Sequence, residues 1–419
     1  MISLAYAALW LFVFSVPWEG VIRISQMAVV SRATGVLAFG LAMLAIVMSG
    51  RIRRWHLTHI AALLFVLWSG CGLLLINFQG VPKKFYTFVQ LFAAMWMIWE
   101  LAPSRQKVLG LLTAYLFGAY LAAIDTVIVY RRQGGALRRF AAGEVDPNDL
   151  AMTLALAVPL AWYLGQTYHR PVMRWIARGY LPLGILAIGL TGSRGGMLAT
   201  MVALMIVPLT MTHLTAGRLV SAIAMLLITG SLAVAYVPTK IVNRLATTGE
   251  QVEDLSLGGR FKLWKAGMTA FTESPLIGYG TASYIKAITP QLGPAAQVAH
   301  NSYISVLVEE GAIGFMLYAT MLFAVFLAVL RLQSIDRRFG LVLYATLGIA
   351  MLPLTWEDRK AVWVILAALV GLSYSQVAGS VASRWQAAPR RVPVIRPTQV
   401  PRPKPMAGPR RSPGRDASA

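Results

Sequence analysis

The sequence of 419 residues holds one cysteine, Cys71, and few charged residues. A single cysteine excludes an intrachain disulfide and a metal site built on several thiolates. Charged residues make up 13% of the chain and hydrophobic residues 57%, which excludes a soluble enzyme of this size. The 38 Lys and Arg against 16 Asp and Glu therefore have to be interpreted by their place relative to a membrane, and not as a nucleic-acid-binding surface.

Many hydrophobic runs reach the roughly 20 residues that cross the hydrocarbon core of a bilayer. They predict an all-α polytopic membrane protein, because a helix satisfies its own backbone hydrogen bonds in lipid. We expect about 12 transmembrane helices, near residues 2–17, 33–49, 58–77, 85–102, 108–130, 149–166, 178–191, 196–214, 219–237, 303–330, 339–355 and 360–378. The chain then divides into nine helices over 1–238, a large loop over 239–302, three helices over 303–380 and a tail over 381–419.

The charges favour one orientation. Placing both termini in the cytoplasm puts more Lys and Arg inside than outside, and it puts most acidic residues and the loop 239–302 outside. We expect spans that are nearly free of charge, with Asp125 as the clearest exception. The basic, proline-rich tail is expected to be disordered, and it either rests on lipid headgroups or only fixes the topology.

His300 is the histidine that this topology places outside. A lone histidine is more often structural than catalytic, but its surroundings favour a functional role. Asn301 or Ser302 is a suitable N-cap for the helical pattern that follows. The positive end of that helix would favour the neutral imidazole that a general base needs. Gly311 and Gly314 would allow this helix to pack closely against a neighbour.

The segment that begins at Leu257 has apolar residues at 257, 261, 264, 268 and 271, a spacing that predicts an amphipathic helix. It would lie in the outer interface of the membrane. We expect Gly258 and Gly259, just before this helix, to leave free N–H groups beside Arg260, an arrangement that suits a phosphate. Lys262 and Lys265 would add positive charge on its polar side.

Further arginines are expected at the outer surface. Arg194 lies in a short polar interruption, Thr191 to Gly196, and needs an anionic partner. This partner is either a substrate phosphate or a carboxylate, such as that of Asp146 or Glu253. A loop carrying Arg131, Arg132, Arg138 and Arg139 opposes the positive-inside bias and suggests anion binding. Asp146 and Asp149, which follow this loop, are expected mainly to cap the next helix.

One outer histidine together with outer arginines in glycine-rich settings describes a site for a diphosphate that would need no metal or cofactor. The motifs follow a fixed order along the chain: Thr191-Gly192-Ser193-Arg194-Gly195-Gly196, Gly259-Arg260 with Trp264, Pro275 to Gly280, and His300-Asn301 followed by Gly311 to Gly314. This order resembles the O-antigen ligase and polymerase superfamily. The motifs cover about residues 140–320, and the tail is not part of the pattern.

The resemblance implies a GT-C-like glycosyltransferase at the periplasmic face of a Gram-negative inner membrane. Its donor would be O-antigen polysaccharide on undecaprenyl diphosphate, and its acceptor the lipid A–core oligosaccharide. His300 would be the general base, and Arg194 and Arg260 would bind the diphosphate. The substrate-binding residues would be Arg138, Arg139, Lys262, Lys265, Asn301 and Asp358. Asp358 would correspond to an acidic residue near the end of ligases, although an ion pair with Arg359 or Lys360 explains it as well.

The resemblance leaves the acceptor open. Members of the same superfamily also polymerise O-antigen units or transfer glycans to Ser and Thr of proteins. A lipid-linked glycan transporter is the alternative from another class, and it would require charged residues along the middle of the membrane. We rank the ligase first because the expected spans are almost free of charge and the loop with four arginines suits a phosphorylated acceptor.

Overall fold

A computed structural model describes residues 1–19, 30–75, 81–133, 139–142, 145–211 and 256–387, with isolated residues within 220–231 and residue 408. These residues contain helices and no strand. Met1–Ala378 form one compact unit and Gly379–Ala419 a second. The disordered tail is predicted over 381–419; its first residues, 381–387, instead continue the last helix, Lys360–Ala387, and the rest, apart from residue 408, lies outside the described residues.

A helix, or a pair of short helices, lies over each expected span except 219–237, which lies mostly outside the described residues, and two further helices, Ser256–Glu273 and Tyr284–Leu292, lie within the expected loop 239–302. The helices are α1 (Ile2–Ser15), α2 (Val30–Ser49), α3 (Leu57–Leu75), α4 (Val81–Leu101), α5 (Arg105–Gln133), α6 (Pro147–Thr167), α7 (Pro171–Thr191), α8 (Arg194–Leu204), α9 (Ile206–Thr210), α12 (Ser256–Glu273), α13 (Tyr284–Leu292), α14 (Ser302–Leu330), α15 (Ser334–Ala350) and α16 (Lys360–Ala387). By length and hydropathy, α2, α5, α6 and α14 can each cross a membrane. The described part of the chain is thus all-helical with four candidate spans, and the total of about 12 stays a prediction.

The polar interruption Thr191 to Gly196 separates two helices, as expected. Gly192, with φ of +59°, ends α7 in the left-handed conformation that glycine adopts readily. Ser193 then caps α8, because its hydroxyl accepts a hydrogen bond from the N–H of Gly196. Arg194 is therefore the first residue of α8, at a helix N-terminus.

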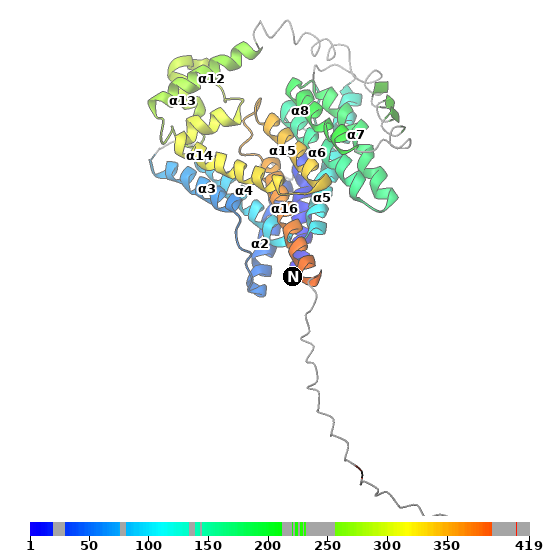
Figure 1. Ribbon diagram of the computed structural model, residues 1–419. Coiled ribbons are helices and arrows are strands. Elements are labelled where there is room, and N and C mark those ends of the chain that lie inside the picture. The colour runs from blue at the N-terminus through cyan, green and yellow to red at the C-terminus, as the bar shows by residue number, and fades with distance from the viewer. Residues whose placement is uncertain are drawn as a thin grey trace, which may run out of the picture. The chain divides into compact units, whose positions relative to one another are not determined.

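Helix α14 runs beside α3 (Figure 1) and contains a break at Gly311. Gly311 has φ of +66°, and a Cβ there would lie 2.3 Å from the carbonyl oxygen of Leu276. A Cβ on Gly278 would come within 2.5 Å of the backbone of α14. Gly311 is thus required for the break, while Gly314 provides the expected close packing, since its Cβ would meet Trp68 of α3 at 2.7 Å.

The segment 274–280 satisfies the backbone groups that the break leaves free. The N–H groups of Tyr279 and Gly280 donate to the carbonyls of Val308 and Glu309, and the indole of Trp68 donates to that of Glu310. In return, the N–H groups of Ala312 and Ile313 donate to the carbonyls of Pro275 and Leu276. This exchange explains how α14 can turn sharply without orphaned polar groups.

The predicted amphipathic helix is present as α12, with one correction. Gly258 and Gly259 lie inside its first turn and not before it, because α12 begins at Ser256. The face that packs on α13 and α14 contains Leu263, Ala266 and Ala270, whereas Phe261 and Met268, from the predicted apolar stripe, are exposed. The helix thus has a second apolar face, which remains available to a membrane interface.

Candidate active site

The segment around His300 is held from both sides. The indole N–H of Trp264, from α12, donates to the carbonyl of Ala299 at 2.8 Å, and the N–H of His300 donates to the hydroxyl of Thr355 at 3.1 Å. Asn301 caps α14 through its side-chain oxygen, as predicted. His300 itself has φ of +47°, a left-handed conformation that costs energy in a residue with a Cβ and is concentrated at functional sites.

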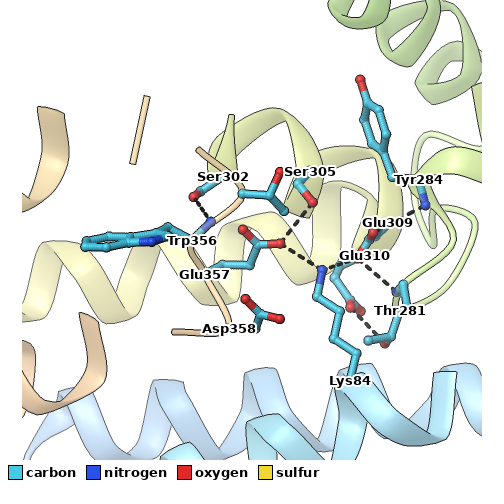
Figure 2. A network of polar contacts seen from close by, with 12 residues as sticks. Lys84, Thr281, Tyr284, Ser302, Ser305, Glu309, Glu310, Trp356, Glu357 and Asp358 are labelled. Carbon is cyan, nitrogen blue, oxygen red and sulfur yellow. Dashed lines mark hydrogen bonds and ion pairs between the residues drawn. The ribbon is translucent and has the colours of Figure 1, made fainter. Parts of the chain in front are cut away.

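The loop 351–359 packs against the start of α14. The N–H of Ser302 donates to the carbonyl of Met351 at 3.0 Å, and its hydroxyl donates to the carbonyl of Leu354 at 2.9 Å. The same hydroxyl accepts from the N–H of Trp356 at 2.7 Å, as Figure 2 shows. These contacts fix the acidic residues Glu357 and Asp358, which follow Trp356, beside the His300 segment.

His300 forms part of the wall of two cavities. We call the first, of about 360 Å³, the acidic cavity; its charged lining residues are Lys84, Asp146, Asp149, Glu309, Asp358 and Arg359. We call the second, of about 340 Å³, the basic cavity; its charged lining residues are Arg260 and Lys262. The imidazole is thus placed where a cationic and a predominantly anionic compartment meet.

The surroundings of His300 favour the neutral imidazole. Burial lowers the pKa of His300 below its usual value, and the charge of Arg260 lowers this pKa further, while Asp146 partly opposes the shift. The predicted neutral state is therefore supported by burial and by the charge of Arg260. A neutral imidazole at pH 7 can accept a proton, which is what general-base catalysis requires.

A buried ionic network stands beside the acidic cavity (Figure 2). Lys84 of α4 binds Glu309 of α14 at 2.7 Å and Glu357 of the 351–359 loop at 2.8 Å. Glu309 also accepts hydrogen bonds from the N–H groups of Ala282 at 2.9 Å and Tyr284 at 3.3 Å. The network thereby joins four separate segments of the chain around one wall of the cavity.

Glu309 and Glu310 correct the expectation of spans almost free of charge. Both are buried in α14, where Glu310 accepts a hydrogen bond from the hydroxyl of Thr281 at 2.8 Å. Sequence reasoning passed over them, together with Lys84 and Glu357. Two adjacent carboxylates inside an apolar run were an available signal, because such residues need partners or a function.

The basic cavity contains some of the predicted binding residues. Arg260 and Lys262 line it together with His300, so the structure brings these three together. Lys265 is exposed on α12 and lines neither cavity. Arg194 is half-buried and also lies outside both linings. The cap of its helix nevertheless contacts a lining residue of the acidic cavity, because Ser193 Oγ donates to Asn148 Oδ1 at 3.0 Å.

Two of the other predicted residues, Arg139 and Asn301, have structural contacts. The guanidinium of Arg139 donates to the carbonyl of Thr191 at 3.0 Å and to Asn148 at 2.6 Å, which braces the turn before α8. Arg138 lies outside the described residues. The side-chain oxygen of Asn301 accepts from the N–H groups of Tyr303 and Ile304, so its observed role is that of a cap.

Asp358 lines the acidic cavity and is weakly paired. Its carboxylate lies 4.0 Å from Arg359, whereas Arg359 pairs with Asp149 at 2.8 Å. Lys360 pairs with Glu19. The interpretation of Asp358 as a mere ion-pair partner is therefore less well supported than a role facing the cavity.

Residues 179–319 match the family model described as O-antigen ligase. This segment, about a third of the chain, is similar to the O-antigen ligase family. No curated protein matches the chain. The O-antigen ligase segment includes Arg194, Arg260, His300 and Glu309, while Lys84, Asp146 and Asp358 come from outside it. The acidic cavity is thus built from both the matched segment and the rest of the chain.

Proposed function

We propose that this protein transfers O-antigen polysaccharide from undecaprenyl diphosphate to a hydroxyl of the lipid A–core oligosaccharide, at the periplasmic face of a Gram-negative inner membrane. The similarity of residues 179–319 to the O-antigen ligase family supports a glycosyltransferase-type enzyme, and the apolar helices support a membrane protein. The observation that carries the proposal is the position of His300, which has a strained backbone and stands between a basic and an acidic cavity.

The chemistry follows from the charges of the two cavities. The donor diphosphate binds in the basic cavity, where Arg260 and Lys262 neutralise it. The acceptor sugar binds in the acidic cavity. His300 takes the proton of the acceptor hydroxyl as its oxygen attacks the anomeric carbon. The bond from that carbon to the diphosphate breaks, undecaprenyl diphosphate leaves with the electron pair, and the anomeric centre is inverted.

Arg194 is the second arginine of the proposal. It begins α8 and therefore lies at the positive end of a helix, next to the Ser193 cap that contacts Asn148. We propose that its guanidinium joins the diphosphate when the donor is bound. Arg260, Lys262 and Arg194 would together supply the positive charge that a metal ion supplies in other diphosphate-dependent enzymes, so the transfer is expected to proceed without a metal.

The test is transfer by purified protein in EDTA, with undecaprenyl-diphosphate glycan as donor and lipid A–core as acceptor. We expect product from the wild type and a loss of 10²- to 10⁴-fold in His300→Ala, the usual contribution of a general base. His169→Ala is the matched control, because His169 is exposed and lines neither cavity.

Two outcomes would change the proposal. Full transfer by His300→Ala would remove the general base and favour a transporter without chemistry. A folded wild type that uses the donor only with a protein acceptor, or only with another glycan, would identify a protein glycosyltransferase or a polymerase of the same superfamily.

A further inference from the structure

The acidic cavity has an uneven balance of charge. Four carboxylates line it, from Asp146, Asp149, Glu309 and Asp358, against the two cations of Lys84 and Arg359. The basic cavity on the other side of His300 has no carboxylate among its lining residues. Charge is thus segregated across the imidazole within the part of the chain that the structure describes.

Both cations of the acidic cavity are already neutralised by the protein. Lys84 Nζ lies within 2.8 Å of two carboxylates, those of Glu309 and Glu357. Arg359 lies 2.8 Å from Asp149. At Lys84, an anionic ligand would have to compete with two short, buried ion pairs, and breaking such pairs is costly. At Arg359 it would have to displace Asp149 from a short pair, although the Arg359 side chain is 51% exposed.

Two carboxylates retain acceptor capacity toward the cavity. Asp146 uses Oδ1 to cap α6 at the N–H groups of Asn148 and Asp149, and its Oδ2 has no partner among the described residues. Asp358 approaches Arg359 only to 4.0 Å. Ionised carboxylates accept hydrogen bonds from hydroxyl groups and repel other anions. Asp146 and Asp358 would therefore favour a ligand with hydroxyl groups and disfavour a ligand with negative charge.

We propose that the acidic cavity selects an uncharged, hydroxyl-rich sugar at the acceptor position and rejects a sugar that carries a carboxylate or phosphate there, with Asp146 and Asp358 as the specificity-determining residues. This inference rests on the proposed transfer reaction and names the class of its acceptor. It also gives each cavity its own ligand: the donor diphosphate, which is anionic, binds only in the basic cavity with Arg260 and Lys262, and the uncharged acceptor sugar binds in the acidic cavity.

The experiment compares two acceptors that differ only in charge. The terminal sugar of the lipid A–core acceptor is oxidised to a uronic acid, and a portion is converted to the methyl ester, which restores neutrality on the same carbon skeleton. Full-length protein in lipid nanodiscs is given the same donor with the acid, the ester or the unmodified acceptor. We expect kcat/KM to be on the order of tenfold higher for the ester than for the acid.

The variants assign this preference to the two carboxylates. Asp146→Asn combined with Asp358→Asn should reduce the ester-to-acid ratio to about one, mainly by improving use of the acid, with an unchanged KM for the donor. Asparagine caps helices as well as aspartate does, so α6 keeps its cap. Glu273→Gln is the matched control, because Glu273 is an acidic residue of the neighbouring α12 that lines neither cavity, and it should leave the ratio unchanged.

The results separate this inference from the proposed function. Equal use of acid and ester by the wild type, or a ratio that survives in the double variant, would overturn the charge selection while transfer itself stands. No transfer by the wild type even to the unmodified acceptor would overturn the proposed function, and with it this inference.

Discussion

Two buried ionic networks lie at opposite ends of α15, and they differ in how completely their charges are paired. At the start of α15, Asp336 binds Arg105 through both carboxylate oxygens, each at 3.0 Å. Tyr163 donates to the same carboxylate at 2.7 Å, and Gln376 donates to it as well. Beyond the end of α15, one ammonium group, that of Lys84, is shared by the carboxylates of Glu309 and Glu357.

The difference separates an ionic group that holds helices together from one that serves a site. The Asp336 network balances one carboxylate with one guanidinium, and its residues line neither the acidic nor the basic cavity. The Lys84 network has a surplus carboxylate, and Oε2 of Glu357 is buried without a hydrogen bond among the described residues. A surplus of buried charge is costly to stability, so its presence beside His300 is evidence for a role in ligand binding.

Removal of Lys84 should have the largest effect, and it tests directly whether the Lys84 network serves the site while the Asp336 network is structural. Lys84→Met leaves Glu309 and Glu357 buried without their cation, which we expect to lower the free energy of unfolding by about 3–5 kcal/mol. It should also lower kcat/KM, because Glu309 holds the N–H groups of Ala282 and Tyr284, two lining residues of the acidic cavity. Thermal unfolding in detergent and transfer kinetics measure the two effects.

The matched variant at the other network is Asp336→Asn. It should cost about 1–3 kcal/mol of stability, because the hydrogen bonds to charged groups are weakened, with kcat/KM per folded molecule unchanged. If Lys84→Met destabilises the protein but keeps full kcat/KM, then both networks are structural and the distinction between them is lost.

Arginine-to-lysine substitutions at Arg260 and Arg105 compare the site with the structural network again, and we expect their effects to be smaller than that of Lys84→Met. Arg105 forms a bidentate pair with Asp336, whereas Arg260 lines the basic cavity and has no ion pair among the described residues. Arg260→Lys should raise the donor KM about 10- to 100-fold without a change in stability, because an ammonium cannot reproduce the two-pronged contact of a guanidinium with a diphosphate.

Arg105→Lys should show the reverse pattern, with stability lowered by about 1–2 kcal/mol and an unchanged donor KM. The measurements are donor titrations and thermal unfolding of both variants. A normal donor KM in Arg260→Lys would remove Arg260 from the diphosphate site.

The helices and part of the site were predictable, because both leave a local signal. Hydrophobic runs locate most of the helices, and His300, Arg260 and Trp264 stand in short motifs with glycines and caps nearby. Asn301 was predictable as a cap from its place before an apolar helical pattern. Such features depend on residues within one or two turns of each other, which a sequence displays directly.

The Lys84 network was not predictable in the same way. Its ion pairs join residues that are 225 and 273 positions apart, and no periodic pattern reports such a pairing. The start of α12 was misplaced by a few residues, because glycines in a first turn resemble a loop. The break at Gly311 depends on the backbone of 274–280, which lies against it only in the folded chain.

The smallest expected effect is a shift in the pH dependence of transfer. His300 must be neutral to act as a base, so kcat/KM should fall as pH decreases through its lowered pKa. Asp146 raises that pKa, so Asp146→Asn should move the acid limb of the profile to lower pH. Arg260→Gln removes a charge that lowers the pKa and should move the limb to higher pH. A shift of both variants in one direction, or none in either, would show that the acid limb does not report on His300.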